Sequence, residues 1–369
     1  VDTLTAPQWV KDAVIYQVFV DRFSPGKGND WKTPDDLLGF FGGTLWGVIE
    51  KLDYIEDLGI NCIWLSPIFD SPSHHGYDAT DIYNVADRYG GNEALRALVD
   101  AAHARGIRIL LDFVCSHVSH ENPIFVDAFE NEDSEYRDWF MFDDSKYGYR
   151  SFFGVKSMPQ LNYFNPAARQ WMIDAARYWI REFDVDGYRL DYAIGPTPDF
   201  WTDFWLGCKE EKADSFCFGE TIDAPDVQMH YHGRLDGCLD FFSSDALRRT
   251  YGFKTRDEAD LERFIERHTS YFPDDFVMPT FLDNHDMDRF LHINGGDKDA
   301  LKKAAQIQMQ LPGPPIIYYG TEVGLTHEKS SQEDGGIHVS RVPMAWGDAQ
   351  DKGLLGFYKR IIAERKKSK

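Results

Sequence analysis

The chain has 369 residues, of which 61 are Asp or Glu and 39 are Lys or Arg, so its formal net charge is −22. Acidic residues are spread along the whole chain, which disfavours nucleic acid and anionic membranes as partners, and we expect neither. No apolar run approaches the roughly 18 residues needed to cross a bilayer.

Apolar segments of strand character alternate with segments of helical period along the chain. Strands are expected at residues 14–23, 60–69, 107–117, 185–193, 215–221, 237–243, 276–286 and 315–321. Between them, apolar residues recur every three or four positions, as at 46–58 and 173–183, and a final helix is expected at 353–367. Eight such units predict a (β/α)₈ TIM barrel, with an open doubly wound sheet as the alternative.

One connection is much longer than the others. About 45 residues rich in Asp, Glu, Phe and Tyr follow the third strand, too many for an ordinary loop. We expect residues 118–165 to form a small inserted subdomain over the barrel mouth. Residues 1–117 and 166–369 would then be the two parts of the barrel, and we expect no C-terminal β-sandwich.

The composition also bears on bound groups. The five cysteines are odd in number and lack CxxC spacing, which favours buried free thiols over a metal site or a disulfide framework. Aromatic residues make up 15% of the chain, and we expect some of them to line a ligand cleft.

Ionisable residues end four of the expected strands. They are Asp112 and His117 on strand three, Arg189 and Asp191 on strand four, Glu220 on strand five, and His285 and Asp286 on strand seven. Each has an ordinary explanation as a helix cap, an ion pair or a structural histidine. In a parallel barrel, however, these strand ends surround one cavity, where unpaired burial of so much charge would cost several kcal/mol per group. The joint pattern therefore indicates a functional site.

Two carboxyl groups with separated pKa values suit glycoside cleavage. Asp191, held ionised by Arg189, would be the nucleophile, and Glu220 the general acid/base. Asp286 would hold charge near the sugar ring, and His285 would bind its hydroxyl groups. We expect the carboxyl groups of Asp191 and Glu220 to lie about 5 to 5.5 Å apart, the separation of a retaining enzyme.

The strand ends read "DFVCSH", "GYRLDYA", "FGET" and "FLDNHD", and in this order they resemble the four signatures of the α-amylase family of retaining glycoside hydrolases. "MPQLN" and "SRVPMAW" are similar to stretches of its neopullulanase and cyclomaltodextrinase branch and of members that act on oligosaccharides. The resemblance implies Asp191 as nucleophile, Glu220 as general acid/base and Asp286 as transition-state stabiliser. It further implies contacts to the bound glucose from Tyr77, His117, Arg189 and His285.

The resemblance implies no cofactor for the chemistry. Ser116 and Lys27 stand where members of the family often bind calcium, which argues against a structural calcium ion. We expect the chain to lack the N-terminal module through which the branch commonly dimerises, and the oligomeric state is open. Free cysteines and the lack of a signal sequence favour the cytoplasm, although secretion with removal of a signal peptide would also fit.

The leading interpretation is a retaining hydrolase of α-glucosidic bonds in starch-derived oligosaccharides, maltodextrins or cyclodextrins, acting through a covalent glycosyl-enzyme intermediate. An α-glucosidase or a transglycosidase would use the same groups. Two further alternatives are a non-catalytic carbohydrate-binding relative and a metal-dependent hydrolase that uses Asp112, His117, His285 and Asp286.

Overall fold

Eight parallel strands form the centre of the molecule. The computed structural model describes residues 6–368, except for the side chain of residue 334. The strands are β1 (Ile15–Val18), β2 (Cys62–Leu65), β5 (Arg108–Val114), β6 (Gly187–Asp191), β7 (Phe216–Gly219), β8 (Gly237–Cys238), β9 (Thr280–Phe281) and β10 (Pro315–Tyr318). They are hydrogen-bonded in the order β8-β7-β6-β5-β2-β1-β10-β9.

The two ends of this strand order meet and close the sheet. Gly237 forms a parallel bridge with Val277, and two backbone bonds join the segments, from Cys238 N to Val277 O at 3.1 Å and from Val277 N to Asp236 O at 2.9 Å. A Cβ atom on Gly237 would lie 1.6 Å from Val277 O, so only glycine permits this approach. The prediction of a (β/α)₈ barrel is confirmed.

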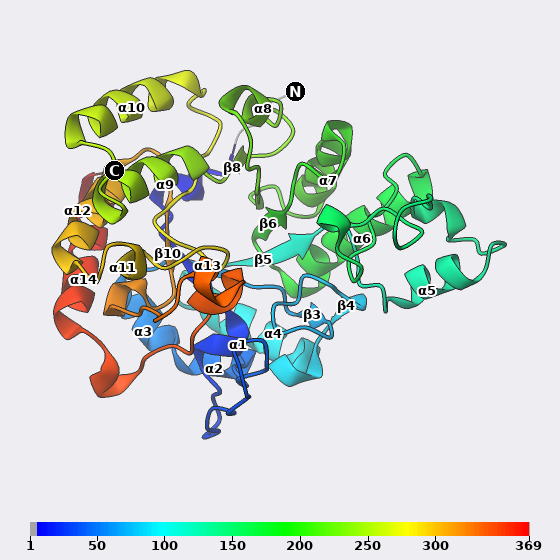
Figure 1. Cartoon of the computed structure of the whole chain (residues 1–369), viewed down its shortest axis with the longest axis horizontal. Coiled ribbons are helices and arrows are strands. Elements are labelled where there is room, and N and C mark those ends of the chain that lie inside the picture. The colour runs from blue at the N-terminus through cyan, green and yellow to red at the C-terminus, as the bar shows by residue number, and fades with distance from the viewer. Residues whose placement is uncertain (1–5, 369) are drawn as a thin grey trace.

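Helices surround the strands (Figure 1). The longer ones are α2 (Leu45–Glu50), α3 (Leu52–Leu58), α4 (Gly91–His103), α6 (Pro166–Phe183), α7 (Pro198–Glu211), α9 (Phe241–Leu247), α10 (Glu258–Tyr271), α12 (Lys298–Gln310) and α14 (Lys352–Ser368). Helix α6 shows why they form: Asn165 caps its N-terminus, Pro166 occupies the first turn, and Met172, Ala176 and Trp179 make a stripe buried against the sheet. Helix α14 confirms the expected final helix.

All eight strands are shorter than expected, and three of them differ the most. The first ends at Val18, and Val20–Phe23 form a short helix, α1. The sixth ends at Cys238 because the carboxylate of Asp240 accepts the backbone N–H of Ser243 and starts α9. Along 276–286 only Thr280–Phe281 are strand. Apolar runs at strand ends continue into helix or loop when a capping side chain takes over the backbone bonds.

Residues 118–165 lie beside the barrel and contain helix α5 (Pro123–Glu130), on the right in Figure 1. Antiparallel bridges join His117 to Gln160 and Ser151 to Pro159, so the two ends of the segment return to the same place. An aromatic cluster holds the segment together; the ring of Phe125 lies 5.0 Å from that of Phe140 and 4.8 Å from that of Tyr149. That residues 118–165 form a separate subdomain stays a prediction.

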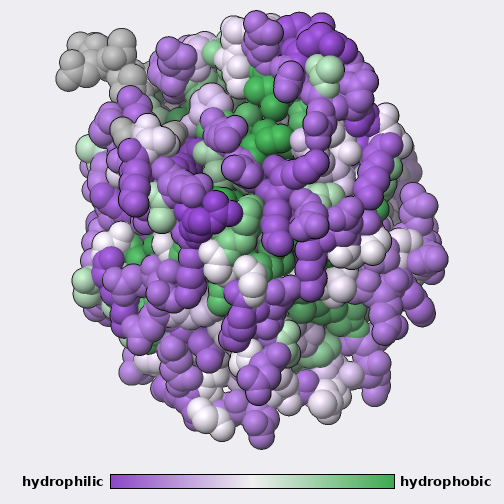
Figure 2. Space-filling model, turned by 90° about the vertical axis from the view of Figure 1, so that its left-hand side faces the viewer, coloured by the Kyte–Doolittle hydropathy of each residue, from purple (hydrophilic) through white to green (hydrophobic). Residues whose placement is uncertain are grey.

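The remaining elements are short. They are β3 (Phe69–Asp70), β4 (Asp81–Val85), α8 (Pro225–Met229), α11 (Phe290–Ile293) and α13 (Ser331–Asp334). All five cysteines are buried and free, as expected. Within residues 6–368 no helix has both the length and the apolar character that crossing a bilayer requires. Figure 2 shows a largely hydrophilic face, with hydrophobic side chains visible in patches between the charged ones.

Candidate active site

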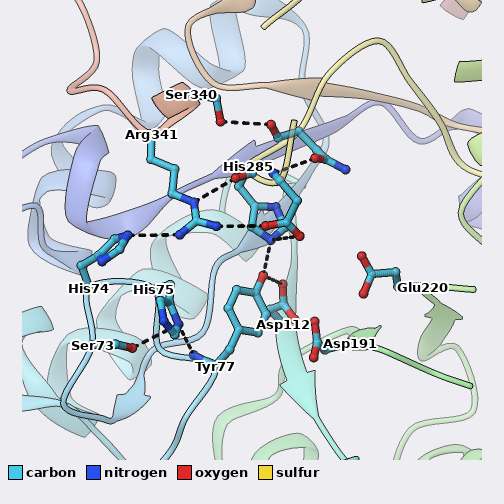
Figure 3. Close-up of polar contacts among 12 residues, drawn as sticks. Ser73, His74, His75, Tyr77, Asp112, Asp191, Glu220, His285, Ser340 and Arg341 are labelled. Atoms are coloured by element: carbon cyan, nitrogen blue, oxygen red, sulfur yellow. Dashed lines mark hydrogen bonds and ion pairs between the residues drawn. The ribbon is translucent and has the colours of Figure 1, made fainter. Parts of the chain in front are cut away.

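The expected acidic residues meet at the C-terminal ends of the strands. Asp191 is the last residue of β6, Glu220 directly follows β7, and Asp286 lies in the loop after β9. Figure 3 shows the carboxyl groups of Asp191, Glu220 and Asp112 turned toward one region, beside Tyr77 and His285. Three strand ends distant in sequence thus bring their acids to one site.

A single guanidinium connects these acids. Arg189, which is fully buried, donates from Nη1 to Asp191 Oδ1 at 2.9 Å and to both carboxylate oxygens of Asp112 at 2.9 and 3.1 Å. Its Nη2 lies 2.8 Å from Glu220 Oε1, close enough for an ion pair but without the alignment of a hydrogen bond. One positive charge therefore faces three buried carboxyl groups, and the aligned bonds go to Asp112 and Asp191.

Glu220 is held from its other side by the backbone. Its Oε2 accepts the N–H of Tyr192 at 3.0 Å. Tyr192 has φ +41°, a left-handed conformation that is uncommon outside glycine and that often marks functional sites. The strained turn after β6 thus aims one N–H at the carboxyl group on the neighbouring strand.

Asp191 and Glu220 both bind a proton more tightly than an exposed carboxyl group does. Burial raises the pKa of both Asp191 and Glu220 to about 7, against the opposing charge of Arg189. We expected Arg189 to hold Asp191 ionised, but burial outweighs that charge. Because the two groups repel each other when both are ionised, they share one proton near neutral pH.

Asp286 behaves in the opposite way. Burial alone would raise its pKa, but His285, Arg341 and Arg189 lower it below the usual range. Its side chain is one-third exposed, and Arg341 Nη2 donates to its Oδ1 at 2.9 Å. At neutral pH this group is therefore a fixed negative charge at the mouth of the site.

A buried chain of hydrogen bonds fixes the side of the site next to β9. Gln17 Nε2 lies 2.8 Å from Nδ1 of His285, and His285 Nε2 lies 2.6 Å from the hydroxyl group of Tyr77. That hydroxyl donates to Asp112 Oδ2 at 2.8 Å. Burial lowers the pKa of His285 to about 3, so the ring is neutral, accepts from Gln17 and carries its proton on Nε2.

His117 has both ring nitrogens bound to protein groups. Ser116 Oγ lies 2.6 Å from Nδ1, and the carbonyl oxygen of Tyr77 lies 2.9 Å from Nε2. The ring fixes the backbone of Tyr77, whose own ring stacks on His285 with centroids 5.4 Å apart. A contact from His117 to a sugar would have to share or replace one of these bonds.

Arg341 was not among the expected site residues. Besides its bond to Asp286, it donates to the carbonyl oxygen of His285 at 2.8 Å, and its Nη1 lies 3.1 Å from His74 Nε2. The only signal for it in the sequence is the stretch "SRVPMAW", which does not state a role. Phe152 and Phe153 were missed as well.

These two aromatic residues extend the site toward the inserted segment. The ring of Phe152 lies 5.0 Å from that of His117 and 4.8 Å from that of Tyr192. Phe153 is 76% exposed, has φ +46°, and its ring lies 5.3 Å from that of Tyr192. An exposed ring in a strained backbone conformation beside Tyr192, whose N–H holds Glu220, is suited to hold a ligand in place.

The two positions that the resemblance links to calcium do not fit that ion. The hydroxyl group of Ser116 is bonded to His117, and the ammonium group of Lys27 lies 3.6 Å from the ring centroid of Trp46. Among residues 6–368 no group of three or more His, Cys, Asp or Glu side chains is placed to hold a metal ion, including the four named for the metal-dependent alternative.

A cavity of about 450 Å³ lies elsewhere in the barrel, against the residues that precede β9 and β10. Its walls include Phe272, Met278 and Leu311, and none of the acids that meet at Arg189 line it. This cavity is therefore separate from the place where the acids meet.

The chain is similar to a known family of enzymes over nearly its whole length. Residues 17–367 match the family model described as the catalytic domain of alpha amylase. The chain is 40% identical over 369 residues to Alpha-amylase 2 of Dictyoglomus thermophilum, covering 99% of this chain and 65% of that protein. It is 36% identical over 388 residues to the cyclomaltodextrinase of Geobacillus thermopakistaniensis, covering 99% of this chain and 64% of that protein. It therefore spans just under two thirds of these relatives.

Among solved structures, the ligand-free cyclic alpha-maltosyl-(1→6)-maltose hydrolase from Arthrobacter globiformis superposes with a TM-score of 0.89 at 31% identity, covering 97% of this chain and 84% of that one. A cyclomaltodextrinase structure gives a TM-score of 0.90 at 33% identity, covering 98% of this chain and 64% of that one. By the extent of these matches, the chain belongs to the alpha-amylase family.

Proposed function

We propose that this protein is a retaining glycoside hydrolase that cleaves α-glucosidic bonds through a covalent intermediate on Asp191. The observation that carries the proposal is the single buried guanidinium of Arg189 between Asp191 and Glu220. The two carboxyl groups share one proton near neutral pH, and the aligned bond from Arg189 favours negative charge on Asp191. The proton then resides on Glu220, which is the state that the first step requires.

In the first step a carboxylate oxygen of Asp191 attacks the anomeric carbon. The bond from that carbon to the bridging oxygen breaks, and Glu220 gives its proton to the departing oxygen. In the second step ionised Glu220 takes a proton from water, the hydroxide oxygen bonds to the anomeric carbon, and Asp191 leaves. Two inversions at the same carbon retain its configuration.

The other site residues act on the sugar around this carbon. We assign Asp286 to stabilise the positive charge that develops on the ring, since Arg341 keeps it ionised. Tyr77 and His285 would contact the same glucose unit, together with Arg189 and, through the Tyr77 backbone, His117. The Tyr77 hydroxyl group already connects His285 to Asp112, so binding needs little rearrangement on this side.

We infer that the substrates are starch-derived oligosaccharides, maltodextrins or cyclodextrins. The support is the similarity to the cyclomaltodextrinase and to the cyclic alpha-maltosyl-(1→6)-maltose hydrolase, whose structure is also known in complex with maltose. An α-glucosidase or a transglycosidase would use the same two steps with a different cleft shape or with a sugar in place of water. A product profile on starch, pullulan and cyclodextrin would separate these activities.

The experiment that tests the proposal is hydrolysis of a nitrophenyl maltoside by the chain and by its Asp191→Asn variant. We expect turnover by the wild type, loss of turnover in the variant, and a first product of α configuration by proton NMR. A β-configured product would refute the retaining mechanism. An inert wild-type chain that still binds maltose would favour the non-catalytic carbohydrate-binding alternative, and loss of turnover on exhaustive chelation would favour a metal-dependent one.

We further propose that residues 118–165 form a subdomain that completes the cleft from one side, with 1–117 and 166–369 as the catalytic barrel. The bridge from His117 to Gln160 and the contact of Phe152 with Tyr192 support this division. A cytoplasmic location is our inference from the five free cysteines. A related protein is named intracellular maltogenic amylase, in Bacillus subtilis, which is compatible with this inference.

A further inference from the structure

The inserted segment contains a recess that is separate from the active-site residues. It has a volume of about 440 Å³, and its walls are Phe125, Val126, Phe129, Tyr147 and Tyr149, with His120, Glu130, Lys146 and Lys156 around them. We propose that this recess is a second binding site for an α-glucan chain. The inference rests on the proposed function and adds to it a site that holds the polymer without cleaving it.

One aromatic ring in the wall of the recess is exposed although its neighbouring rings are packed against it. Phe129, at the end of α5, is 47% exposed. Its ring is stacked on that of Phe125 at 5.7 Å and meets that of Tyr149 edge-on at 5.6 Å. Fixed neighbours on these sides leave the remaining surface of the ring open, which suits the flat apolar face of a sugar ring.

A tight turn places a second ring at the same recess. Gly148 has φ +81°, a conformation that glycine adopts without strain, and its N–H donates to Ser145 O at 2.9 Å. This turn leaves Tyr147 half-buried, with the ammonium group of Lys146 5.0 Å from its ring centroid. On the other side of Gly148, the hydroxyl group of Tyr149 donates to Lys156 O at 2.7 Å and anchors this ring. The wall is therefore built before any ligand arrives.

The polar groups of the recess indicate a neutral ligand rich in hydroxyl groups. Glu130 offers acceptors, and Lys146 and Lys156 offer donors. A hydroxyl group can donate and accept, so it can bond to the carboxylate and to both ammonium groups, whereas a purely apolar ligand would leave them without a partner in the recess.

The recess lies close enough to the active site to serve one glucan chain together with it. His120 follows His117 by three residues, at most about 10 Å of extended backbone. A polymer held at the recess would be present near the catalytic acids at a high effective concentration. The expected benefit therefore concerns long glucans and leaves short substrates unaffected.

The test uses a chain made inactive by Glu220→Gln, so that the glucan is not consumed. Maltoheptaose is titrated by calorimetry, and retardation is measured in native gels that contain soluble starch. We expect two bound oligosaccharides per chain, and one after Phe129→Ala or Tyr147→Ala is added. Retardation by starch should weaken about tenfold, or about 1.4 kcal/mol, in these variants. The matched control is Phe253→Ala, which removes a ring that is 54% exposed between α9 and α10, on the far side of the barrel from α5 (Figure 1).

The outcomes separate this inference from the proposed function. Hydrolysis of nitrophenyl maltoside by the otherwise wild-type chain should be unchanged by Phe129→Ala and Tyr147→Ala. One bound oligosaccharide per chain before and after the changes, with active hydrolysis, would overturn the second site and leave the proposed function standing. Absence of hydrolysis in the wild type would remove the proposed function and this inference with it.

Discussion

The buried carboxyl group of Glu220 should reduce the stability of the fold, and the reduction should depend on pH. Burial raises its pKa from 4.5 to about 7, although Arg189 acts against the rise. A group whose pKa is higher in the folded chain stabilises the fold fully below its unfolded pKa, and this contribution is lost as pH rises through the folded pKa. The loss should therefore occur between pH 4.5 and about 7, and above that range ionised Glu220 should weaken the fold.

The size of the effect follows from the pKa change. One pKa unit corresponds to about 1.4 kcal/mol, so a rise from 4.5 to about 7 amounts to about 3 kcal/mol at pH 8. Because Glu220 shares a proton with Asp191, the observed value should lie somewhat below this limit. We expect Glu220→Gln, which cannot ionise, to raise the free energy of unfolding by about 2 to 3 kcal/mol at pH 8 and by less than about 1 kcal/mol at pH 5.

Urea unfolding followed by tryptophan fluorescence at the two pH values would measure this difference. The control is Glu132→Gln, a change of the same chemistry at an exposed residue, which should alter stability little at either pH. Equal effects of Glu220→Gln at pH 5 and pH 8, or a loss of stability at pH 8, would refute the reasoning that burial dominates at this group.

Four further predictions concern catalysis and can be checked by steady-state kinetics on a soluble maltoside. Asp191→Asn should lower kcat by on the order of 10⁴-fold without unfolding the chain, as circular dichroism would confirm. The wild-type kcat/KM should fall above about pH 7 as the shared proton is lost, and a flat profile to pH 9 would contradict this. Arg341→Met should raise the pKa of Asp286 and move the acidic limb of that profile to higher pH. Tyr77→Phe, which removes the bond to Asp112, should lower kcat/KM about tenfold with little change in the pH profile.

Most of the correct predictions follow from one rule, that the functional residues of a parallel barrel lie at the C-terminal ends of its strands. Asp191 ends the strand GYRLD and Glu220 follows the strand FCFG, and the apolar and aromatic residues of these short runs located the end of each strand to within a few residues. A parallel barrel then places those ends together whatever the loops do. The resemblance of the four motifs to the family signatures then gave each acid its expected role, which geometry alone does not assign.

The sequence could not show Arg341 or Gln17 as partners of the site. Arg341 follows the short helical turn Ile337–Ser340 and reaches Asp286 from a loop after β10, 55 residues away in the chain. Gln17 lies inside β1, where a polar residue has no expected neighbour until the barrel is closed. Contacts of this kind depend on loop paths and side-chain directions, for which periodicity carries no signal.

The charge on Asp191 is the clearest case of a property that neither the motif nor the strand position determines. Arg189 beside Asp191 suggests an ordinary ion pair, in which the carboxylate stays ionised at all moderate pH values. In the structure the same guanidinium also faces Asp112 and Glu220, so its charge is divided among three buried acids. One cation cannot keep three buried carboxylates ionised against their mutual repulsion, and a proton must enter the group. Because the acids outnumber the base, the group retains a proton, and this is the proton that Glu220 donates in the proposed reaction.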